Sequence, residues 1–291
     1  MIILITGGSG FIGTALCRRL IADGHAVLNL DIRKPQFKHY RMQWLNLDVC
    51  ERVYQHVDQI YNLACHASPQ RYQKDPIHTM RTCVLGAMNM LDLAVVNKCK
   101  ILQASTSEVY GDAKEHPQRE TYHGLVNPIG PRSCYDEGKR AAESLFFSYY
   151  RTHAVQIKVA RIFNTYGPGM DPDDGRVVPT FVRQTREGAP LLVYGDGRQT
   201  RSFCYIDDMV TGLIALMASR DGVTGPINLG GTEEVTVAAL AGMFGDEFEY
   251  KPLPVDDPIQ RCPDISRART ALGWEPQINL KEGIRRCMSQ S

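Results

Sequence analysis

The segment IILITGGSGFIG, residues 2–13, joins a run of β-branched residues to a glycine-rich turn, and an amphipathic stretch follows it. A strand, a glycine turn and a helix in this order are the context in which a glycine motif is informative. The glycines can be read as Gly8-x-Gly10-x-x-Gly13 or as Gly7-x-x-Gly10-x-x-Gly13. In both spacings the backbone can approach a pyrophosphate at a helix N-terminus, where free N–H groups favour an anion. The segment predicts a dinucleotide site, with an ordinary glycine turn as the alternative.

A second predicted strand, residues 26–30, ends at Asp31, and this residue bears on the choice of dinucleotide. Asp31 follows Gly13 at close to the spacing of about 20 residues expected of an acid that binds the ribose 2′-hydroxyl. A carboxylate there repels a 2′-phosphate and favours NAD, whereas Arg33 and Lys34 argue mildly for NADP. Asp48, at the end of the next strand candidate, either reaches the adenine or caps a helix before Glu51.

Strand candidates at residues 42–47, 59–64, 100–105 and 155–163 alternate with helical patterns, notably at 76–97 and from residue 135 onward. This alternation predicts an α/β fold, a doubly wound parallel sheet of the Rossmann type. From about residue 170 the alternation weakens, with helical patterns at 176–187 and 205–219 and an extended one at 191–194. We therefore expect an NAD-binding Rossmann domain over 1–168. A smaller C-terminal substrate lobe is expected over 169–291, with some of its segments returning to the first domain.

The composition argues against several other functions. The net charge is +1 and 22% of the residues are charged, which indicates neither a nucleic acid nor another polyanion as partner. We find no apolar run of the roughly 18 residues that a membrane span needs, and no signal peptide, so we expect a cytoplasmic protein. The nine cysteines include no C-x-x-C pair and are interpreted as reduced thiols. The segment 171–175 resembles a calcium loop but lacks the acidic twelfth ligand, since residue 182 is Val, so no metal site is predicted.

Tyr135 and Lys139 are the candidate acid–base pair. They are four residues apart in SCYDEGKR, residues 133–140, so on a helix they share one face. A fixed ammonium one turn away favours the phenolate and lowers the pKa of the phenol, which makes the tyrosine a general base for a hydroxyl proton. Tyr110 and Lys114 have the same spacing, but the segment from Gly111 to Pro117 reads as a loop. We interpret that second pair as a coincidence.

Polar residues that follow the strand at 100–105 are further site candidates, because the carboxyl ends of parallel strands face the ligand crevice. Ser107 can bond to the same hydroxyl that Tyr135 deprotonates. Glu108 is either a surface turn residue or a second acid–base group. In the C-terminal half, arginines suited to phosphate or carboxylate lie in or beside turn-rich stretches: Arg176, Arg201 and Arg261.

With these segments assembled, the chain resembles the extended short-chain dehydrogenase/reductases of the NAD-dependent epimerase/dehydratase family that act on nucleotide sugars. Within them it looks most like the UDP-glucuronate decarboxylases, which form UDP-xylose. The resemblance rests on residues 6–13, STSEVYG (105–111), NPIGPRSCYDEGK (127–139), ARIFNTYGP (160–168), DGRVV (174–178), VYGDGRQTR (193–201), RCPDI (261–265) and LGWEP (272–276). Of these, STSEVYG is the most specific, because related 4,6-dehydratases carry Asp-Glu in place of Ser107-Glu108 and 4-epimerases usually lack the Glu.

The resemblance implies oxidation at sugar C4, loss of the C6 carboxylate from the 4-keto acid, and re-reduction, with NAD regenerated in each cycle. Tyr135 with Lys139 takes the 4-hydroxyl proton, Thr106 and Ser107 line the sugar site, and Glu108 and Arg261 serve decarboxylation or protonation. Cofactor contacts are assigned to Gly7, Gly10, Phe11, Ile12, Gly13, Asp31, Asp48, Val49, Ala64, Tyr135 and Lys139. Substrate contacts are assigned to Asn164, Arg176, Val177, Tyr194, Arg201 and Arg261.

The chain departs from the family pattern at two places near the expected cofactor. Thr82 is followed by Cys83 where the family often has Asn, and a Ser-Pro-Ala-Ser-Pro loop here reads Cys65-His66-Ala67-Ser68-Pro69. The nearest alternative function is a 4-epimerase for the same sugar acid; a non-catalytic NAD-binding sensor is a second. The resemblance also implies a homodimer built on apolar residues of the helices at 76–97 and around Tyr135.

Overall fold

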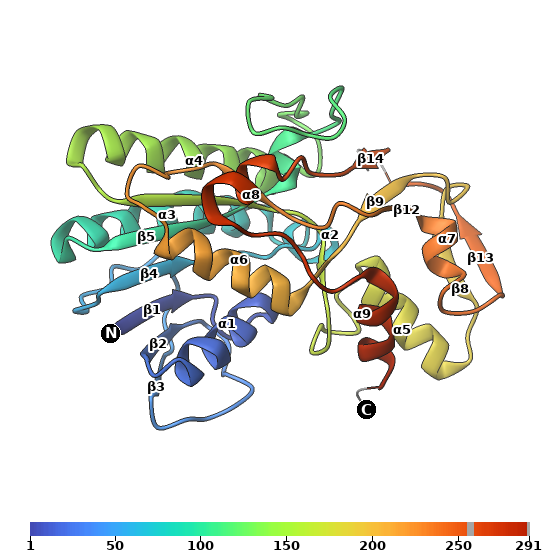
Figure 1. Ribbon diagram of the computed structural model, residues 1–291, viewed down its shortest axis with the longest axis horizontal. Coiled ribbons are helices and arrows are strands. Elements are labelled where there is room, and N and C mark those ends of the chain that lie inside the picture. The colour runs from blue at the N-terminus through green and yellow to red at the C-terminus, as the bar shows by residue number, and fades with distance from the viewer. Residues whose placement is uncertain (255–258, 290–291) are drawn as a thin grey trace.

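A seven-stranded parallel sheet forms the centre of the computed structural model, which describes residues 1–254 and 259–289 (Figure 1). Its strand order is β11-β6-β5-β4-β1-β2-β3. The strands are β1 (Ile2–Thr6), β2 (Ala26–Leu30), β3 (Met42–Leu45), β4 (Gln59–Asn62), β5 (Lys100–Thr106), β6 (Ile157–Ile162) and β11 (Ile227–Leu229). Because β2 and β4 flank β1 on opposite sides, the direction of winding reverses there. Ligands of such sheets bind at the carboxyl ends of the strands beside this point.

Helices cover both faces of the sheet, which confirms the doubly wound α/β fold. Side chains alternate between the faces along each strand. Ile3 and Ile5 pack in one core with residues of α1 (Phe11–Ala22) and α6 (Ile206–Ala218). Leu4 packs in the other core with residues of α3 (Pro76–Asn97) and α4 (Ser133–His153).

α3 satisfies the length and composition of a membrane-spanning helix, although the sequence shows no unbroken apolar run of that length. Half of its most apolar window is buried inside the protein, and Ala87, Met90 and Leu91 belong to the second core. This is the burial of a core helix that packs on α4 and the sheet.

The smaller lobe consists of short elements at the far end of the sheet from the N-terminus (Figure 1). α5 (Val177–Glu187) is followed by a parallel pair, β8 (Leu191–Tyr194) with β13 (Phe248–Lys251). β9 (Thr200–Ser202) pairs with β12 (Glu234–Thr236) and β14 (Gln260–Arg261). The remaining elements of the lobe are β7 (Thr165–Tyr166) paired with β10 (Cys204–Tyr205), α7 (Val237–Ala241) and α9 (Leu280–Ser289).

Among the described residues, three elements of the C-terminal half belong to the large domain: β11, α6, and α8 (Ser266–Leu272), which packs on both of them. β11 adds a strand beside β6, and α6 covers the face that α1 also covers. These elements fall within residues 169–291, and the division of the chain at residue 168 stays a prediction. Residues 255–258 and 290–291 of that range lie outside the described residues.

Candidate active site

A cavity of about 650 Å³ lies between the carboxyl ends of the central strands and the smaller lobe. All residues assigned to catalysis, cofactor and substrate from the sequence contribute to its lining. The cofactor set lies on the Rossmann side. Asn164, Arg176, Val177, Tyr194 and Arg201 come from β6 or later segments. The fold thus brings the predicted residues together, and their individual roles remain predictions.

The glycine turn between β1 and α1 has little room for side chains, and Gly10 is the least crowded of its four glycines. A Cβ on Gly7, whose φ is +70°, would lie 2.9 Å from the backbone of Ala64. A Cβ on Gly13 would lie 2.1 Å from the carbonyl oxygen of Gly7, and one on Gly8 would meet Asn29. Gly10 is the N-cap residue of α1, and a Cβ on it would lie 3.1 Å from the Gly7 carbonyl oxygen. The turn fits a pyrophosphate held by the N-terminus of α1.

Asp31 is buried at the end of β2 with both carboxylate oxygens engaged. Oδ2 accepts a hydrogen bond of 3.0 Å from the Ser9 N–H, and Oδ1 accepts one of 2.8 Å from the Arg33 N–H. The Arg33 Nε lies 3.6 Å from Oδ1, so the cation that argued mildly for NADP is partly neutralised by Asp31. An anionic side chain at this position fits a ribose with a free 2′-hydroxyl.

Asp48 does not cap a helix, because residues 49–51 form a turn and a bend. Its Oδ1 accepts a hydrogen bond of 2.8 Å from the Cys50 N–H, and its Oδ2 lies 2.7 Å from His78 Nε2. Burial raises the pKa of Asp48, but the bonds from Cys50 and His78 outweigh burial and lower it. The adenine role of Asp48 remains the standing hypothesis.

Tyr135 and Lys139 are both buried on α4, as the sequence predicted, but their electrostatics differ from the expectation. The Lys139 ammonium donates to the Ala104 carbonyl at 2.9 Å and lies 5.8 Å from the centre of the Tyr135 ring. Burial raises the pKa of Tyr135 well above its usual value, although a hydrogen bond with Thr106 lowers it. Lys139 was expected to lower this pKa, but the net shift in the protein alone is upward, because the loss of solvent at the phenol dominates.

The second pair, Tyr110 and Lys114, is indeed a coincidence of spacing. Tyr110 ends the short 3₁₀ helix η1 (Ser107–Tyr110) and is fully buried, whereas Lys114 lies exposed in the following loop. The Tyr110 hydroxyl donates to Asn228 Oδ1 at 2.7 Å and accepts from Arg161 Nη1 at 3.0 Å. Tyr110 is therefore a structural hydrogen-bonding residue.

Glu108 lies on η1 beside two arginines. Arg132 Nη2 lies 2.5 Å from Glu108 Oε2, and Arg261 Nη2 lies 3.6 Å from the same oxygen. Burial raises the pKa of Glu108, but Arg261, Arg132 and Arg201 outweigh it and lower the pKa to about 2. Glu108 is an anion at neutral pH. It is neither a free surface residue nor a ready proton donor.

Arg261 is buried to 1% exposure and connects the two lobes. From β14 its Nη1 donates to the Ser107 carbonyl, and its Nη2 donates to the Gly111 carbonyl at 3.1 Å. These bonds hold both ends of η1, which carries Glu108. Arg261 is therefore better described as a positioning residue than as the group that contacts the reacting atoms.

Sequence reasoning missed Tyr72 and Arg132. Tyr72 ends the short helix α2 (Pro69–Tyr72) and stacks on Tyr135, with ring centres 5.0 Å apart and planes 2° from parallel. Its hydroxyl is buried and has no hydrogen-bond partner among the described residues. Arg132 could have been identified from the sequence, because it lies within the motif 127–139 on which the resemblance rests. Nothing in the sequence indicates that Tyr72 reaches Tyr135.

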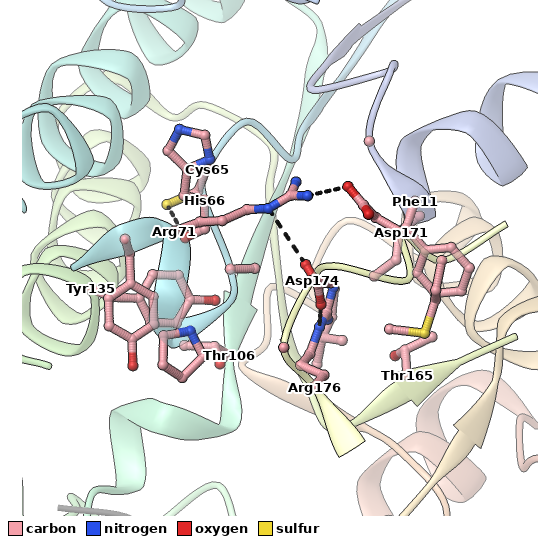
Figure 2. Close-up of a pocket in the computed structure, with 18 of the residues that line it drawn as sticks. Phe11, Cys65, His66, Arg71, Thr106, Tyr135, Thr165, Asp171, Asp174 and Arg176 are labelled. Atoms are coloured by element: carbon pink, nitrogen blue, oxygen red, sulfur yellow. Dashed lines mark hydrogen bonds and ion pairs between the residues drawn. The ribbon is translucent and has the colours of Figure 1, made fainter. Parts of the chain in front are cut away.

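A bridge of charged residues crosses the cavity from Arg71 to the smaller lobe. Figure 2 shows Arg71 reaching from the side that carries Cys65 and Tyr135 toward Asp171 and Asp174. Arg71 pairs with Asp171, and its Nε lies 3.9 Å from Asp174 Oδ1; Arg176 pairs with the other oxygen of Asp174. The carboxylates that resembled a calcium loop are thus bound to arginines.

Comparisons with known proteins agree with this geometry. Residues 3–230 match the model of the NAD dependent epimerase/dehydratase family. The chain belongs to this family. UDP-glucuronic acid decarboxylase 1 of Arabidopsis thaliana is 50% identical over 99% of the chain and 69% of the relative. UDP-glucuronic acid decarboxylase 1 of Xenopus tropicalis is 47% identical over 97% of the chain and 70% of the relative.

A solved structure of this family has the same fold together with bound ligands. It is a tyrosine-to-phenylalanine mutant of UDP-glucuronic acid 4-epimerase from Bacillus cereus, in complex with UDP-4-deoxy-4-fluoro-glucuronic acid and NAD. It superposes with a TM-score of 0.89 at 27% identity, over 99% of this chain and 98% of that one. Because this neighbour is named as a 4-epimerase, epimerisation stays the alternative to decarboxylation.

Asp136, next to Tyr135, is a further residue that sequence reasoning missed. It is buried, and its Oδ1 has no hydrogen-bond partner among the described residues. Burial raises its pKa to about 8; Glu108 and Glu137 add to the rise, and Arg132 and Arg261 oppose it. A neutral acid therefore lies beside the anionic Glu108.

We expect Asp136→Asn to remove a pH dependence of stability. A raised folded-state pKa stabilises the fold fully below the unfolded pKa of about 3.9 and loses this effect as pH rises through about 8. The asparagine variant should therefore gain on the order of 1–3 kcal/mol of unfolding free energy relative to the parent between pH 5 and pH 8.5. Urea unfolding across this range measures the difference. Parallel curves for the two proteins would contradict it.

Proposed function

We propose that the protein converts UDP-glucuronate to UDP-xylose and carbon dioxide through a 4-keto intermediate, with NAD regenerated in each cycle. The observation that carries the proposal is the Glu108 carboxylate, held by Arg132 and Arg261 at the end of β5 in the cavity that Tyr135 also lines. The identity of about 50% to UDP-glucuronic acid decarboxylases over nearly the whole chain supports it.

NAD fits the Rossmann side of the cavity through the closely packed glycine turn, the N-terminus of α1 and the Asp31 side chain. When bound, it takes a hydride from sugar C4 and later returns it. The nucleotide part of the substrate is assigned to Asn164, Tyr194 and Arg201 on the opposite side of the cavity. This arrangement would place sugar C4 between cofactor and nucleotide, beside Tyr135.

Tyr135 is the base for the 4-hydroxyl proton, and Thr106, its hydrogen-bond partner, orients the phenol. To accept that proton Tyr135 must be a phenolate, a form that burial disfavours in the protein alone; the Lys139 ammonium and the positive charge that bound NAD would bring to the cavity would favour it. Once C4 is a ketone, the C5–C6 bond breaks, carbon dioxide leaves, and the electron pair forms an enolate across C4 and C5.

Glu108 acts in the protonation of C5. As an anion it accepts a hydrogen bond from a water molecule and so directs that water's other proton at the enolate carbon; the hydroxide left behind takes up a proton from solvent, the one proton that the overall reaction consumes. Arg132 fixes the carboxylate at 2.5 Å, and Arg261 fixes the segment on which it lies. A 4-epimerase needs no such step, because it returns the hydride to the other face of the ketone.

Incubation with UDP-glucuronate and NAD should yield UDP-xylose and one equivalent of carbon dioxide. Product mass and NMR identify the sugar, and trapped carbon dioxide measures the lyase reaction. Formation of the C4 epimer alone, without carbon dioxide, would show that the protein is an epimerase. NADP in place of NAD should support little turnover, because Asp31 repels the 2′-phosphate.

Tyr135→Phe should abolish hydride transfer while substrate binding survives, since the base for the 4-hydroxyl is lost. Tyr110→Phe is the matched control. It should retain turnover within a few-fold and lose about 1–3 kcal/mol of stability, because Asn228 and Arg161 each lose a buried hydrogen-bond partner. Absorbance at the NADH band in single turnovers and urea unfolding separate the two effects. Equal loss of hydride transfer in both variants means that the wrong tyrosine has been chosen.

Glu108→Gln should fold, bind NAD and still form NADH slowly, but release carbon dioxide at least about 10-fold more slowly. Oxidation needs only Tyr135 and a placed nicotinamide, whereas C5 protonation needs the carboxylate. We expect Arg261→Ala to lose stability as well, because it removes the bonds to Ser107 and Gly111. Parallel traces of NADH and carbon dioxide test the assignment, and an unchanged rate of UDP-xylose formation in Glu108→Gln would refute it.

We also propose a homodimer through α3 and α4. The apolar residues expected at this interface are Met80, Val84, Ala87, Met88 and Leu91 of α3 and Ala141, Leu145, Phe146 and Tyr149 of α4. Three of these belong instead to the core: Ala87, Leu91 and Phe146. Other large apolar side chains on α3 are exposed: Ile77, Leu85, Met88 and Val96. Light scattering at micromolar concentration should give twice the chain mass, and Met88→Asp should shift it toward the monomer. A monomeric mass for the parent protein would refute the proposal.

A further inference from the structure

Two thiols lie in contact beneath the cofactor side of the cavity. Cys65 Sγ, in the loop after β4, and Cys83 Sγ, on α3, are 3.4 Å apart. These are the two positions at which the sequence departs from its family's usual residues near the cofactor. Cys65 lines the cavity, whereas Cys83 is 2% exposed behind it. A small molecule in the cavity can therefore approach the pair from the Cys65 side.

The surroundings make the pair reactive. The hydrogen bond from Cys65 lowers the pKa of Cys83 against the opposing effect of burial, and the ammonium of Lys139 lowers it further. The same contact, with burial, raises the pKa of Cys65. The pair therefore shares one proton readily, as a thiol beside a thiolate. Reactivity of cysteine follows the thiolate, and a neighbouring thiol is what resolves an oxidised sulfur.

We propose that Cys65 and Cys83 form an oxidation site that a hydroperoxide converts to an intramolecular disulfide. One thiolate of the pair attacks the O–O bond of the peroxide and becomes a sulfenic acid, and hydroxide leaves and takes up a proton as water. The sulfur of the other cysteine then attacks the sulfenic sulfur, forms the S–S bond and releases the second water. Two thiols and one hydrogen peroxide thus give one disulfide and two waters. A dithiol reductant reverses the reaction by thiol–disulfide exchange.

Closing the pair displaces the loop that lines the cavity. A disulfide needs its sulfurs about 2.05 Å apart, so the gap must shorten by more than 1 Å. Cys83 has little freedom to move, because α4 packs on it: a Cβ on Gly138 would lie 2.9 Å from the Cys83 Cβ. The segment from Cys65 to Tyr72 must therefore move when the disulfide forms. The Tyr72 ring at the end of this segment stacks on Tyr135.

Oxidation should therefore suppress turnover reversibly. A misplacement of about 1 Å at a reacting geometry lowers rates by up to about 100-fold, and we expect at least a 10-fold loss here. This part of the inference rests on the proposed function. Formation of the disulfide does not.

The test treats the purified, reduced full-length protein with hydrogen peroxide, alkylates the remaining thiols and digests without reduction. Trypsin isolates each cysteine in a peptide that contains no other, residues 53–71 for Cys65 and 82–98 for Cys83. We expect these two peptides as one cross-linked species that dithiothreitol separates, and an intact mass lower by about 2 Da. Carbon dioxide release should fall and recover in parallel.

Two variants make the result specific. Cys83→Ser should give no cross-linked species and keep its turnover after peroxide. Cys134→Ser removes a third thiol nearby, whose Sγ lies 3.7 Å from the Tyr72 carbonyl, and should still form the cross-link.

Linkage of Cys65 to Cys134, or oxidation without any cross-link, overturns the proposal. Equal inactivation of Cys83→Ser overturns the link to turnover. If no variant releases carbon dioxide even when reduced, the proposed function fails while the peptide map still decides the disulfide.

Discussion

The Arg261 guanidinium is the contact on which the geometry of the cavity depends. It lies in the smaller lobe and is almost completely buried, yet it donates to two carbonyls of the Rossmann side, at Ser107 and Gly111. A buried cation without partners costs several kcal/mol, so the lobes are held where these carbonyls and Glu108 can meet it. One side chain therefore fixes the separation of the lobes and the place of the carboxylate between them.

Two neighbouring carboxyl groups of this site have pKa values shifted in opposite directions. Glu108, between Arg132 and Arg261, has its pKa lowered to about 2, whereas burial raises that of Asp136 to about 8. At neutral pH the site holds one anion and one neutral acid. Environments that separate titrating groups in this way are typical of acid–base catalysis, because each group is ready for a different task. Tyr135 adds a third buried group, whose pKa burial raises well above its usual value in the protein alone.

Much of this could be predicted from the sequence, and the limits have physical causes. Periodicity located β1, β2, α3 and β8 at their observed ends, because each has a buried pattern bounded by turn residues. The strands expected at 42–47 and 59–64 are shorter by two residues, since their last residues leave the ladder to face the cavity. The residues that the motifs assigned to the site all line one cavity. The motifs did not indicate the raised pKa of Tyr135 or the contribution of Tyr72, Arg132 and Asp136 to the site. Burial and contacts between distant segments are properties of the folded chain alone.

The return of α6 and β11 to the large domain has a consequence for folding cooperativity. A fragment ending at residue 168 would lack the strand that covers the β6 edge and the helix that shields the apolar face shared with α1. It would leave an open sheet edge and an uncovered core, the features that promote aggregation. The two lobes are separable as binding surfaces but not as folding units, and the Rossmann half is complete only after the chain has passed through the smaller lobe and returned.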